Sequence, residues 1–580
     1  MAVQPQLDVV GGSGKGRVIR FWLVLFGLVF FSLPGAAQDG GPEQARLAAA
    51  QKAFDAADWG EAARLTEGPA DQASELDLLR GLALSHLEKW DDAKGALEAG
   101  ARKSPRDSRF PVELAGIAYK QKDFGLAKKD LQAALRLNSN DAYTNEFLST
   151  IYFLEGNLEA ALKYWNREDK PRLRSVTFVP ALKLSEHLGD RALAANAPQV
   201  LTGDALLATE SRLDNLGIFS SRRIELTPAE SGNYDLTLHV TERNLWGSSK
   251  AEGMLSLLSG LPYRTVYPEF YNLGGDAMNL RSLARWDPEK RRVFVDLSLP
   301  LYGDPSLRLR FYADARNENW NLSQTFSGLR TPLTDLNMRQ VAAGAEFRNV
   351  INGRSSWSAG AEAANRNFRN LPGALSPAER AFFTGGGSLA GWLGAERTLW
   401  RVPEHRFTLD SSVKATAGRE FALGPFATLQ GSLSARWFPR AKGDDYGMRW
   451  QIRAGATAGK TSLDDLFQLG VERDNQLWLR GHPGTIDGRK GAAPLGRRYF
   501  LANWELDKNV YDNGLVSVKL GPFLDNGAIA DSSGFFGSPG WLWDSGLQCK
   551  VRILNGVSVV FSYGQNLRGG KGVFYGTVLR

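Results

Sequence analysis

The feature that most constrains this chain is a regular alternation of apolar and polar residues over its second half. In residues 307–316, LRLRFYADAR, every second residue is apolar, and residues 407–415 and 448–456 follow the same pattern. A period of two indicates β-strands with one apolar and one polar face. No helical pattern between these segments could cover the apolar face, so its partner has to come from elsewhere.

Membrane lipid fits that requirement, because hydrocarbon covers the outside of a transmembrane barrel while polar side chains line its interior. Residues 247–580, at roughly 20 residues per strand and turn, have room for about 16 antiparallel strands. The plentiful Gly and Trp, 62 and 16 residues, suit such a barrel. A periplasmic or surface β-solenoid is the alternative, which the aromatic-rich strands and polar interior argue against. We therefore predict a C-terminal outer-membrane β-barrel.

The beginning of the chain, residues 1–37, is typical of a secretory signal peptide. Lys15, Arg17 and Arg20 precede an apolar stretch, and the small residues of SLPGAA follow it. This order predicts export and cleavage after Ala37. An uncleaved membrane anchor is the alternative, although the stretch is shorter than the about 20 apolar residues that span a bilayer.

A pattern of large and small residues occurs four times between residues 41 and 170. Bulky residues spaced by 31, 34 and 34 positions are each followed three residues later by alanine: Trp59 and Ala62, Trp90 and Ala93, Phe124 and Ala127, Leu158 and Ala161. Small residues let two helices approach closely, and the bulky residue fills the gap between them. The pattern resembles tetratricopeptide repeats, which implies a helical solenoid whose groove binds a peptide or protein. A spacer or platform is the alternative.

Residues 171–246 combine a helix pattern with a hairpin pattern. A helix containing Leu213 and Leu216 ends at Gly217, which suits a left-handed cap, and Phe219 opens a strand. These four residues resemble the leucine-x-x-leucine-glycine-x-phenylalanine step of the POTRA domain, the polypeptide-transport-associated module. The first helix of that module is poorly marked here, and an ordinary α+β linker domain is the alternative.

An arginine stands inside a late loop-like stretch, LWLRGHPG, at position 480. Each of the two strands expected after it turns one carboxylate inward, Glu505 and Asp525. A guanidinium away from bulk water needs such partners and can bridge them with paired hydrogen bonds. We therefore predict an internal lock in which Arg480 contacts Asp525 and Glu505 shares the contact. An exposed loop tip is the alternative.

A POTRA-like module followed by such a barrel resembles the BamA/TamA superfamily, which contains outer-membrane assembly factors and two-partner-secretion transporters. The resemblance covers about residues 171–580. In that superfamily the Arg-Gly pair, here Arg480 and Gly481, lies on an inward-folded loop. Its partner on a strand is a Phe-x-Asp-x-Gly sequence, which corresponds here to Phe523, Asp525 and Gly527.

Two departures from the superfamily pattern are visible. His482 follows the Arg-Gly pair where an aromatic residue is usual, and the chain ends in Arg580 where the last strand normally ends in an aromatic residue. These departures indicate a divergent branch.

Membership would imply transport or insertion of proteins at the outer membrane, with the N-terminal modules in the periplasm. The seam between the first and last strands, near 250–258 and 572–580, would open sideways. An unfolded or extended client polypeptide would pair with its edge through backbone hydrogen bonds. The repeats would recruit a client or a periplasmic partner protein, and the barrel would contact outer-membrane lipid.

The alternatives are an exporter of polysaccharide or of a single dedicated surface or secreted partner, and a barrel-anchored enzyme. Against an enzyme, no His-Glu-x-x-His sequence is present and the five His residues are scattered singly. We expect no catalytic residues, cofactor or metal. The single cysteine, Cys549, excludes an internal disulfide framework. The net charge of +7 lies in no like-charge block, so we expect no nucleic-acid partner.

Overall fold

The computed structural model describes residues 41–69, 72–326, 333–439, 445–554, 556–570 and 572–579. The chain divides into two compact units after Asp169, and each is described by itself. The predicted signal peptide, residues 1–37, lies outside the described residues. In the part of the chain that the structure describes, no helix is long and apolar enough to cross a membrane.

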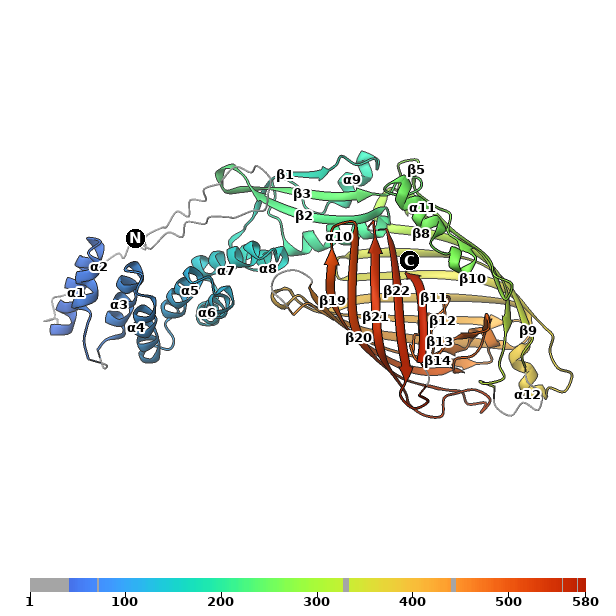
Figure 1. Cartoon of the computed structure of the whole chain (residues 1–580). Coiled ribbons are helices and arrows are strands. Elements are labelled where there is room, and N and C mark those ends of the chain that lie inside the picture. Colours follow the sequence, from blue (N-terminus) through green and yellow to red (C-terminus); the bar gives the residue numbers. More distant parts are fainter. Residues whose placement is uncertain are drawn as a thin grey trace. The chain divides into compact units, whose positions relative to one another are not determined.

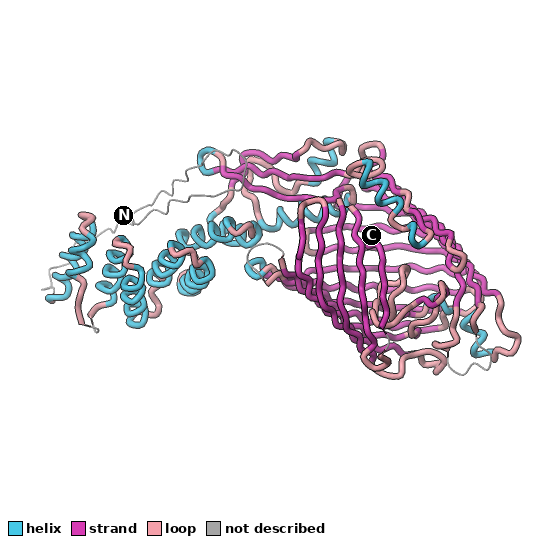
Figure 2. The backbone as a smooth tube through the Cα atoms, viewed as in Figure 1, coloured by secondary structure: helices cyan, strands magenta, loops and turns pink. Residues whose placement is uncertain are grey.

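The first unit is helical (Figures 1 and 2). Its α-helices are α1 (Pro42–Asp55), α2 (Trp59–Leu65), α3 (Ser74–His86), α4 (Trp90–Lys103), α5 (Arg109–Lys120), α6 (Phe124–Leu137), α7 (Ala142–Leu154) and α8 (Leu158–Trp165). The four bulky residues of the sequence repeat are the first residues of α2, α4, α6 and α8, and the four repeat alanines are completely buried. The helical region is therefore present, and its assignment to the tetratricopeptide family stays a prediction.

The second unit begins with a small sheet in the order β1–β3–β2. Its elements are β1 (Arg172–Val179), α9 (Glu186–Ala192), α10 (Gly203–Leu216), β2 (Phe219–Pro228) and β3 (Asn233–Glu242). Strand β3 is parallel to β1 and antiparallel to β2. Helix α9 has only seven residues, which explains its weak sequence signal. The POTRA assignment stays a prediction.

Helix α10 ends where the sequence predicted. Leu213 and Leu216 are buried, and Gly217 caps the helix in the left-handed conformation with φ of 68°. A residue with a Cβ adopts that conformation at a cost, which is why glycine suits the position. Phe219 is the first residue of β2.

One large antiparallel sheet, consistent with a β-barrel, makes up the rest of the unit (Figure 1). Its long strands are β6 (Met278–Trp286), β7 (Lys290–Leu301), β8 (Asp304–Trp320), β9 (Leu336–Asn352), β10 (Ser355–Arg369), β11 (Gly386–Val402), β12 (Phe407–Glu420), β13 (Gly424–Trp437), β14 (Tyr446–Gly459), β19 (Arg498–Asp512), β20 (Val516–Ala530), β21 (Leu542–Ile553), β22 (Val557–Asn566) and β23 (Gly572–Leu579). Each pairs antiparallel with the next, and β14 pairs with β19.

The two faces of this sheet differ as the alternation predicted. Leu393, Leu429 and Leu547 are more than half exposed on the outer face. Charged side chains such as Asp296 and Asp525 are buried on the inner face. Exposed apolar side chains on one face and buried charges on the other are the arrangement that a transmembrane barrel has.

The start of the sheet differs from the prediction. Residues 250–258, expected near the first strand, form helix α11 (Lys250–Leu258). The hydroxyl of Ser249 caps this helix by accepting a hydrogen bond from the backbone N–H of Glu252 at 3.1 Å. The segment KAEGMLSLL also lacks alternation, so a strand here was the wrong expectation.

The first described strands of the large sheet are the short β4 (Thr265–Val266) and β5 (Glu269–Leu273), both paired with β6. Against the expected count of about 16, the described sheet has eighteen strands: the fourteen long ones, β4, β5, and the short β16 (Thr485–Ile486) and β17 (Arg489–Lys490). We call the boundary between β23 and β4–β5 the seam. The strand order places β23 beside β4, but among the described residues no run of paired residues joins β23 to β4 or β5.

The end of the sheet away from β1–β3 is filled by a buried apolar cluster. It draws on the ends of β8, β9 and β10, on the loops after β8, β10 and β20, and on the long loop 460–497: Trp320, Leu322, Phe326, Leu333, Leu336, Met338, Phe368, Phe382, Phe383, Leu463, Leu466, Leu495 and Phe536. Burial of so many large side chains stabilises these loops against one another. The cluster thus joins the loops at this end of the sheet to one another.

Candidate functional site

The loop between β14 and β19, residues 460–497, folds back against the inner face of the sheet. Leu469 and Leu479 are completely buried and pack with residues of β19, β20 and β21. The short strands β15 (Phe467–Gln468) and β18 (Leu495–Gly496) pair with each other near the two ends of the loop. We call this segment the inner loop.

The structure brings Arg480 together with both carboxylates named from the sequence. Its Nη2 lies 2.6 Å from Asp525 Oδ1, and its Nε donates to Asp525 Oδ2 at 2.8 Å. Its Nη1 donates to Glu505 Oε1 at 2.7 Å and to Gln548 Oε1 at 2.8 Å. The guanidinium also lies 3.7 Å from the centre of the Phe523 ring. This set of contacts, which we call the late-strand anchor, fixes the inner loop to β19, β20 and β21.

The two glycines of the predicted lock lie at points of close approach. A Cβ at Gly481 would lie 2.6 Å from Asp544 Cγ and 2.7 Å from the backbone N of Asn566. A Cβ at Gly527 would lie 3.1 Å from the carbonyl O of Phe500 and 3.2 Å from a methyl carbon of Leu469. Both glycines therefore let the inner loop and the strands come closer than other residues would allow.

His482, which stands where an aromatic residue was expected, has polar partners. Its Nδ1 lies 3.0 Å from Asp544 Oδ2, and its Nε2 lies 3.2 Å from Asn566 Nδ2. The backbone N–H of Gly481 donates to the same Asp544 oxygen. The departure from the superfamily pattern thus adds two hydrogen bonds from the inner loop to β21 and β22.

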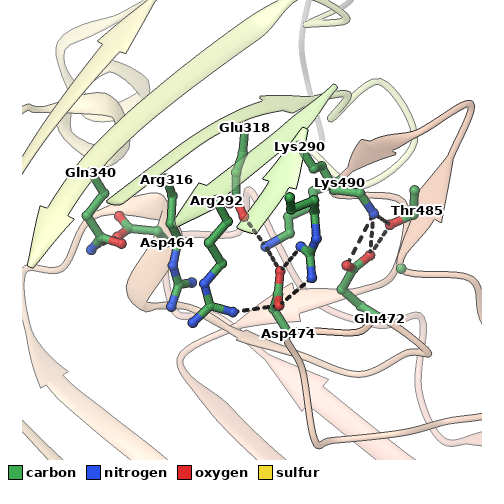
Figure 3. A network of polar contacts seen from close by, with 12 residues as sticks. Lys290, Arg292, Arg316, Glu318, Gln340, Asp464, Glu472, Asp474, Thr485 and Lys490 are labelled. Atoms are coloured by element: carbon green, nitrogen blue, oxygen red, sulfur yellow. Dashed lines mark hydrogen bonds and ion pairs between the residues drawn. The ribbon is translucent and has the colours of Figure 1, made fainter. Parts of the chain in front are cut away.

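A second cluster of charges joins the inner loop to the first strands (Figure 3). Asp474 lies 2.8 Å from Arg285 on β6 and 2.7 Å from Arg292 on β7. Glu472 lies 3.3 Å from Lys290 at the start of β7. The side chains of Arg285, Lys290, Glu472 and Asp474 are all less than a tenth exposed. We call these contacts the early-strand anchor.

The early-strand anchor is held in an ionised state by its own charges. Burial alone would raise the pKa of Asp474, but the charges of Lys490, Arg285 and Arg292 outweigh burial and hold that pKa well below its usual value. Lys490 also contacts Glu318 on β8 at 2.7 Å. The carboxylate of Asp474 therefore stays charged and paired near neutral pH.

From its early-strand anchor toward its late-strand anchor, the inner loop passes the seam. The Arg473 guanidinium lies 3.3 Å from the centre of the Tyr263 ring, just before β4. The Trp478 ring lies 5.8 Å from the Tyr575 ring on β23. The Tyr263 hydroxyl donates to the backbone carbonyl of Gly576 on β23 at 2.7 Å. The inner loop thus contacts both sides of the seam.

The small β1–β3 domain contacts the large sheet through the end of α10. The backbone carbonyl of Leu216 accepts a hydrogen bond from Asn279 Nδ2 at 2.9 Å, and that of Asn215 accepts one from the Arg308 guanidinium. The last carbonyls of a helix lack partners within the helix, and a cation there is favourable. The predicted Leu-Gly step is thus a docking point on β6 and β8.

The early-strand anchor and the Arg308 contact were not found from the sequence. Their residues form no local motif, and their partners lie 90 to 190 positions away in the chain. Among the residues that the structure describes, no group of three or more His, Cys, Asp or Glu could hold a metal ion.

Comparison with known proteins gives likeness of structure only. No protein-family model and no curated protein matches the sequence. The solved structure of BamA from Haemophilus ducreyi lacking POTRA domains 1–3 is 12% identical over 70% of this chain and 84% of its own, with a TM-score of 0.41. CdiB from Escherichia coli is 14% identical over 71% of this chain and 75% of its own, with a TM-score of 0.46. CdiB from Acinetobacter baumannii is 14% identical over 73% and 81%, with a TM-score of 0.42. Likeness at this level carries no argument about activity, which has to be inferred from the residues of this chain.

Proposed function

We propose that this protein inserts or translocates client polypeptides at the outer membrane of a Gram-negative-type bacterium, in the manner of the BamA/TamA superfamily. The observation that carries the proposal is the seam. There β23 lies beside β4 without a run of paired residues, and the inner loop contacts both sides through side chains.

The proposed mechanism uses backbone chemistry. An unpaired strand edge presents N–H and C=O groups that any extended polypeptide can satisfy. A client strand would pair at the seam, and release of the inner loop from one side would widen the seam. The repeats of the first unit would recruit a client or periplasmic partner, and the POTRA-like domain would pass it to the sheet.

Export of polysaccharide through the interior is less well supported. The inner loop packs against the inner face, and the apolar cluster joins the loops at the end of the sheet away from β1–β3. A polymer crossing the interior would have to displace both. Pairing at the seam requires neither to leave completely.

The test is quantitative proteomics of outer membrane, cell surface and medium after depletion of this protein, with a parallel analysis of surface glycans. Depletion should remove polypeptides, and re-expression of the wild-type chain should restore them. Loss of many β-barrel proteins would indicate a general assembly factor, and loss of one surface or secreted protein would indicate a dedicated transporter. Loss of a glycan with an unchanged proteome would overturn the proposal in favour of export.

A further inference from the structure

The outer face of the large sheet carries a row of polar residues near the end away from β1–β3. Four residues lie opposite one another in the antiparallel registers of neighbouring strands: Arg291 on β7, Asn317 on β8, Arg339 on β9 and Asn367 on β10. The next residue along β7, Arg292, points the other way and binds Asp474 of the inner loop. The four residues therefore face outward, and we call them the outer row.

The outer row lies at the edge of the apolar outer face. On β7, Arg291 precedes four apolar residues at the outward positions of 293–299. On β12, the outward positions of 407–417 hold apolar residues and Ser411, and Arg419 comes next. Ten residues of strand extend about 33 Å, which at a tilt of about 40° spans about 25 Å, the height of the apolar band of a membrane barrel. These arginines thus lie where lipid headgroups begin.

The protein does not neutralise the two arginines of the outer row. Both are exposed, and no carboxylate of the described residues forms an ion pair with either. The carboxylates of the adjoining turns have other partners. Glu289 and Asp335 pair with Arg489 at 3.1 Å and 2.6 Å, and Asp287 accepts backbone N–H groups of its own turn. Two guanidinium groups therefore face the membrane interface without an opposite charge from the protein.

Positive charge is concentrated at this end of the outer face. Three more exposed arginines lie on outward positions there: Arg369, Arg419 and Arg498. At the opposite end the outward cations are Arg397 and Lys508, and Lys508 Nζ lies 5.6 Å from the centre of the Tyr446 ring. The two leaflets that such a sheet contacts would therefore meet different charges, and the more anionic leaflet suits the end with the outer row.

The spacing of the outer row indicates the kind of headgroup. Neighbouring strands lie about 4.8 Å apart, so the backbones at Arg291 and Arg339 are about 10 Å apart. Between them, Asn317 accepts a hydrogen bond from Asn337 Nδ2 at 2.7 Å, which holds its amide in place. A guanidinium binds a phosphate with paired hydrogen bonds, and an amide binds sugar hydroxyls. A headgroup with one phosphate would engage one arginine, whereas a sugar with two phosphates would engage both and the amide between them.

We propose that the outer row binds the phosphorylated sugar headgroup of a glycolipid of the lipopolysaccharide class in the outer leaflet. The inference rests on the proposed function for the membrane and for the orientation, which turns this end of the sheet to the cell surface. It adds a lipid partner and the residues that bind it. A bound headgroup would hold β7–β10 at the surface of the leaflet.

The experiment measures the lipid retained by the purified full chain in detergent, by native mass spectrometry. The probes are bisphosphorylated lipid A, the same lipid A with both phosphates removed, and phosphatidylglycerol, which has one phosphate. The test variant combines Arg291→Gln with Arg339→Gln. The matched control combines Arg397→Gln with Lys508→Gln, which removes two exposed cations from the opposite end of the outer face.

We expect the wild-type chain to retain bisphosphorylated lipid A several-fold more than either other lipid. The test variant should lose this preference, and the control should keep it. Because both arginines are exposed and unpaired in the protein, urea unfolding of the test variant should match that of the wild type. The combination of Arg291→Lys and Arg339→Lys, which keeps the charges but not the paired hydrogen bonds, should be intermediate.

Three results would overturn the inference: equal retention of all three lipids by the wild type, unchanged preference in the test variant, or equal loss in the test variant and the control. Retention of phosphatidylglycerol equal to that of lipid A would also contradict it, because any anionic lipid would then suffice. Failure of the proposed function is seen separately. If lipid A is retained as expected while depletion leaves the proteome unchanged, the lipid site stands and the proposed function fails.

Discussion

Both anchors fix the inner loop to the sheet, but the loop contributes different charges to each. At the late-strand anchor the loop supplies the cation, Arg480, and the strands supply the carboxylates. At the early-strand anchor the loop supplies the carboxylates, Glu472 and Asp474. The strands supply the cations Arg285, Lys290 and Arg292, and Lys490 of the loop adds a fourth. The charges of the loop are only a few residues apart, so a shifted or reversed loop would face like charges on both walls.

This difference shows how side-chain charges can fix the position of a loop across a seam that lacks continuous strand pairing. A buried charge is stable only against an opposite charge, so each wall accepts one part of the loop and rejects the other. The late-strand anchor adds rigid geometry, through the backbone of Gly481 and the ring of Phe523. The early-strand anchor is a network of separate ion pairs, and we expect it to be the one that releases first.

The largest effect should come from Arg480→Glu, which places a third carboxylate beside Asp525 and Glu505. Loss of one partner of a buried pair costs about 3–5 kcal/mol, and reversal of its charge should cost more. We expect rapid protease cleavage in residues 460–497 and a large fall in the free energy of unfolding in urea. Arg480→Lys, which keeps the charge but loses the paired hydrogen bonds, is the matched control and should be intermediate. Unchanged protease protection in Arg480→Glu would show that the contacts of Arg480 do not hold the inner loop in place.

Asp474→Asn should have the next largest effect, about 3 kcal/mol, because it leaves Arg285 buried without its carboxylate. Arg292 keeps Asp314 and Lys490 keeps Glu318, which limits the loss. The free energy of unfolding measures it, with Glu396→Gln as a control at an exposed ion pair on the inner face. A cost for Asp474→Asn above that for Arg480→Glu would reverse the ranking of the two anchors.

Gly481→Ala tests a second feature of the late-strand anchor, the close approach of the inner loop to β21 and β22, without changing any charge. The added methyl group would meet Asp544 and the backbone of Asn566, and overpacking of this kind costs about 1–3 kcal/mol. Gly373→Ala is the control, because a Cβ at Gly373 has open space around it. Equal unfolding curves for the two variants would show that the loop does not need its close contact with β21.

The smallest effect should be that of mild acid on Asp474. Its folded pKa is lowered well below the usual value, so its stabilisation is present above the unfolded pKa of about 3.9 and is lost only as the pH falls toward the folded pKa. The difference in unfolding free energy between wild type and Asp474→Asn should therefore be the same at pH 7 and pH 5. A smaller difference at pH 5 would mean that Asp474 is less firmly paired than the structure shows.

The sequence was informative where a pattern is local. Alternation located the strands, the cap residue Gly217 located the end of α10, and the Arg-Gly pair pointed to Asp525 and Glu505. It gave no sign of the early-strand anchor, because Asp474 and Arg285 belong to no local pattern and lie 189 positions apart in the chain. It was wrong at residues 250–258, where resemblance to a family suggested a strand and the local preference for helix, capped by Ser249, prevailed.

The most direct test of the account is to lock the seam and ask whether the protein still works. Tyr263→Cys and Gly576→Cys, in a Cys549→Ser background, face each other across the seam, since a Cβ at Gly576 would lie 3.1 Å from the Tyr263 hydroxyl. A cleavable bis-maleimide would join them in cells depleted of the wild-type chain, and Ala415→Cys with Leu429→Cys would receive the same bridge within the β12–β13 ladder. The account predicts that the bridged seam fails to restore the lost proteins, that cleavage of the bridge restores them, and that the control pair works throughout. Full restoration with the seam bridged would contradict it.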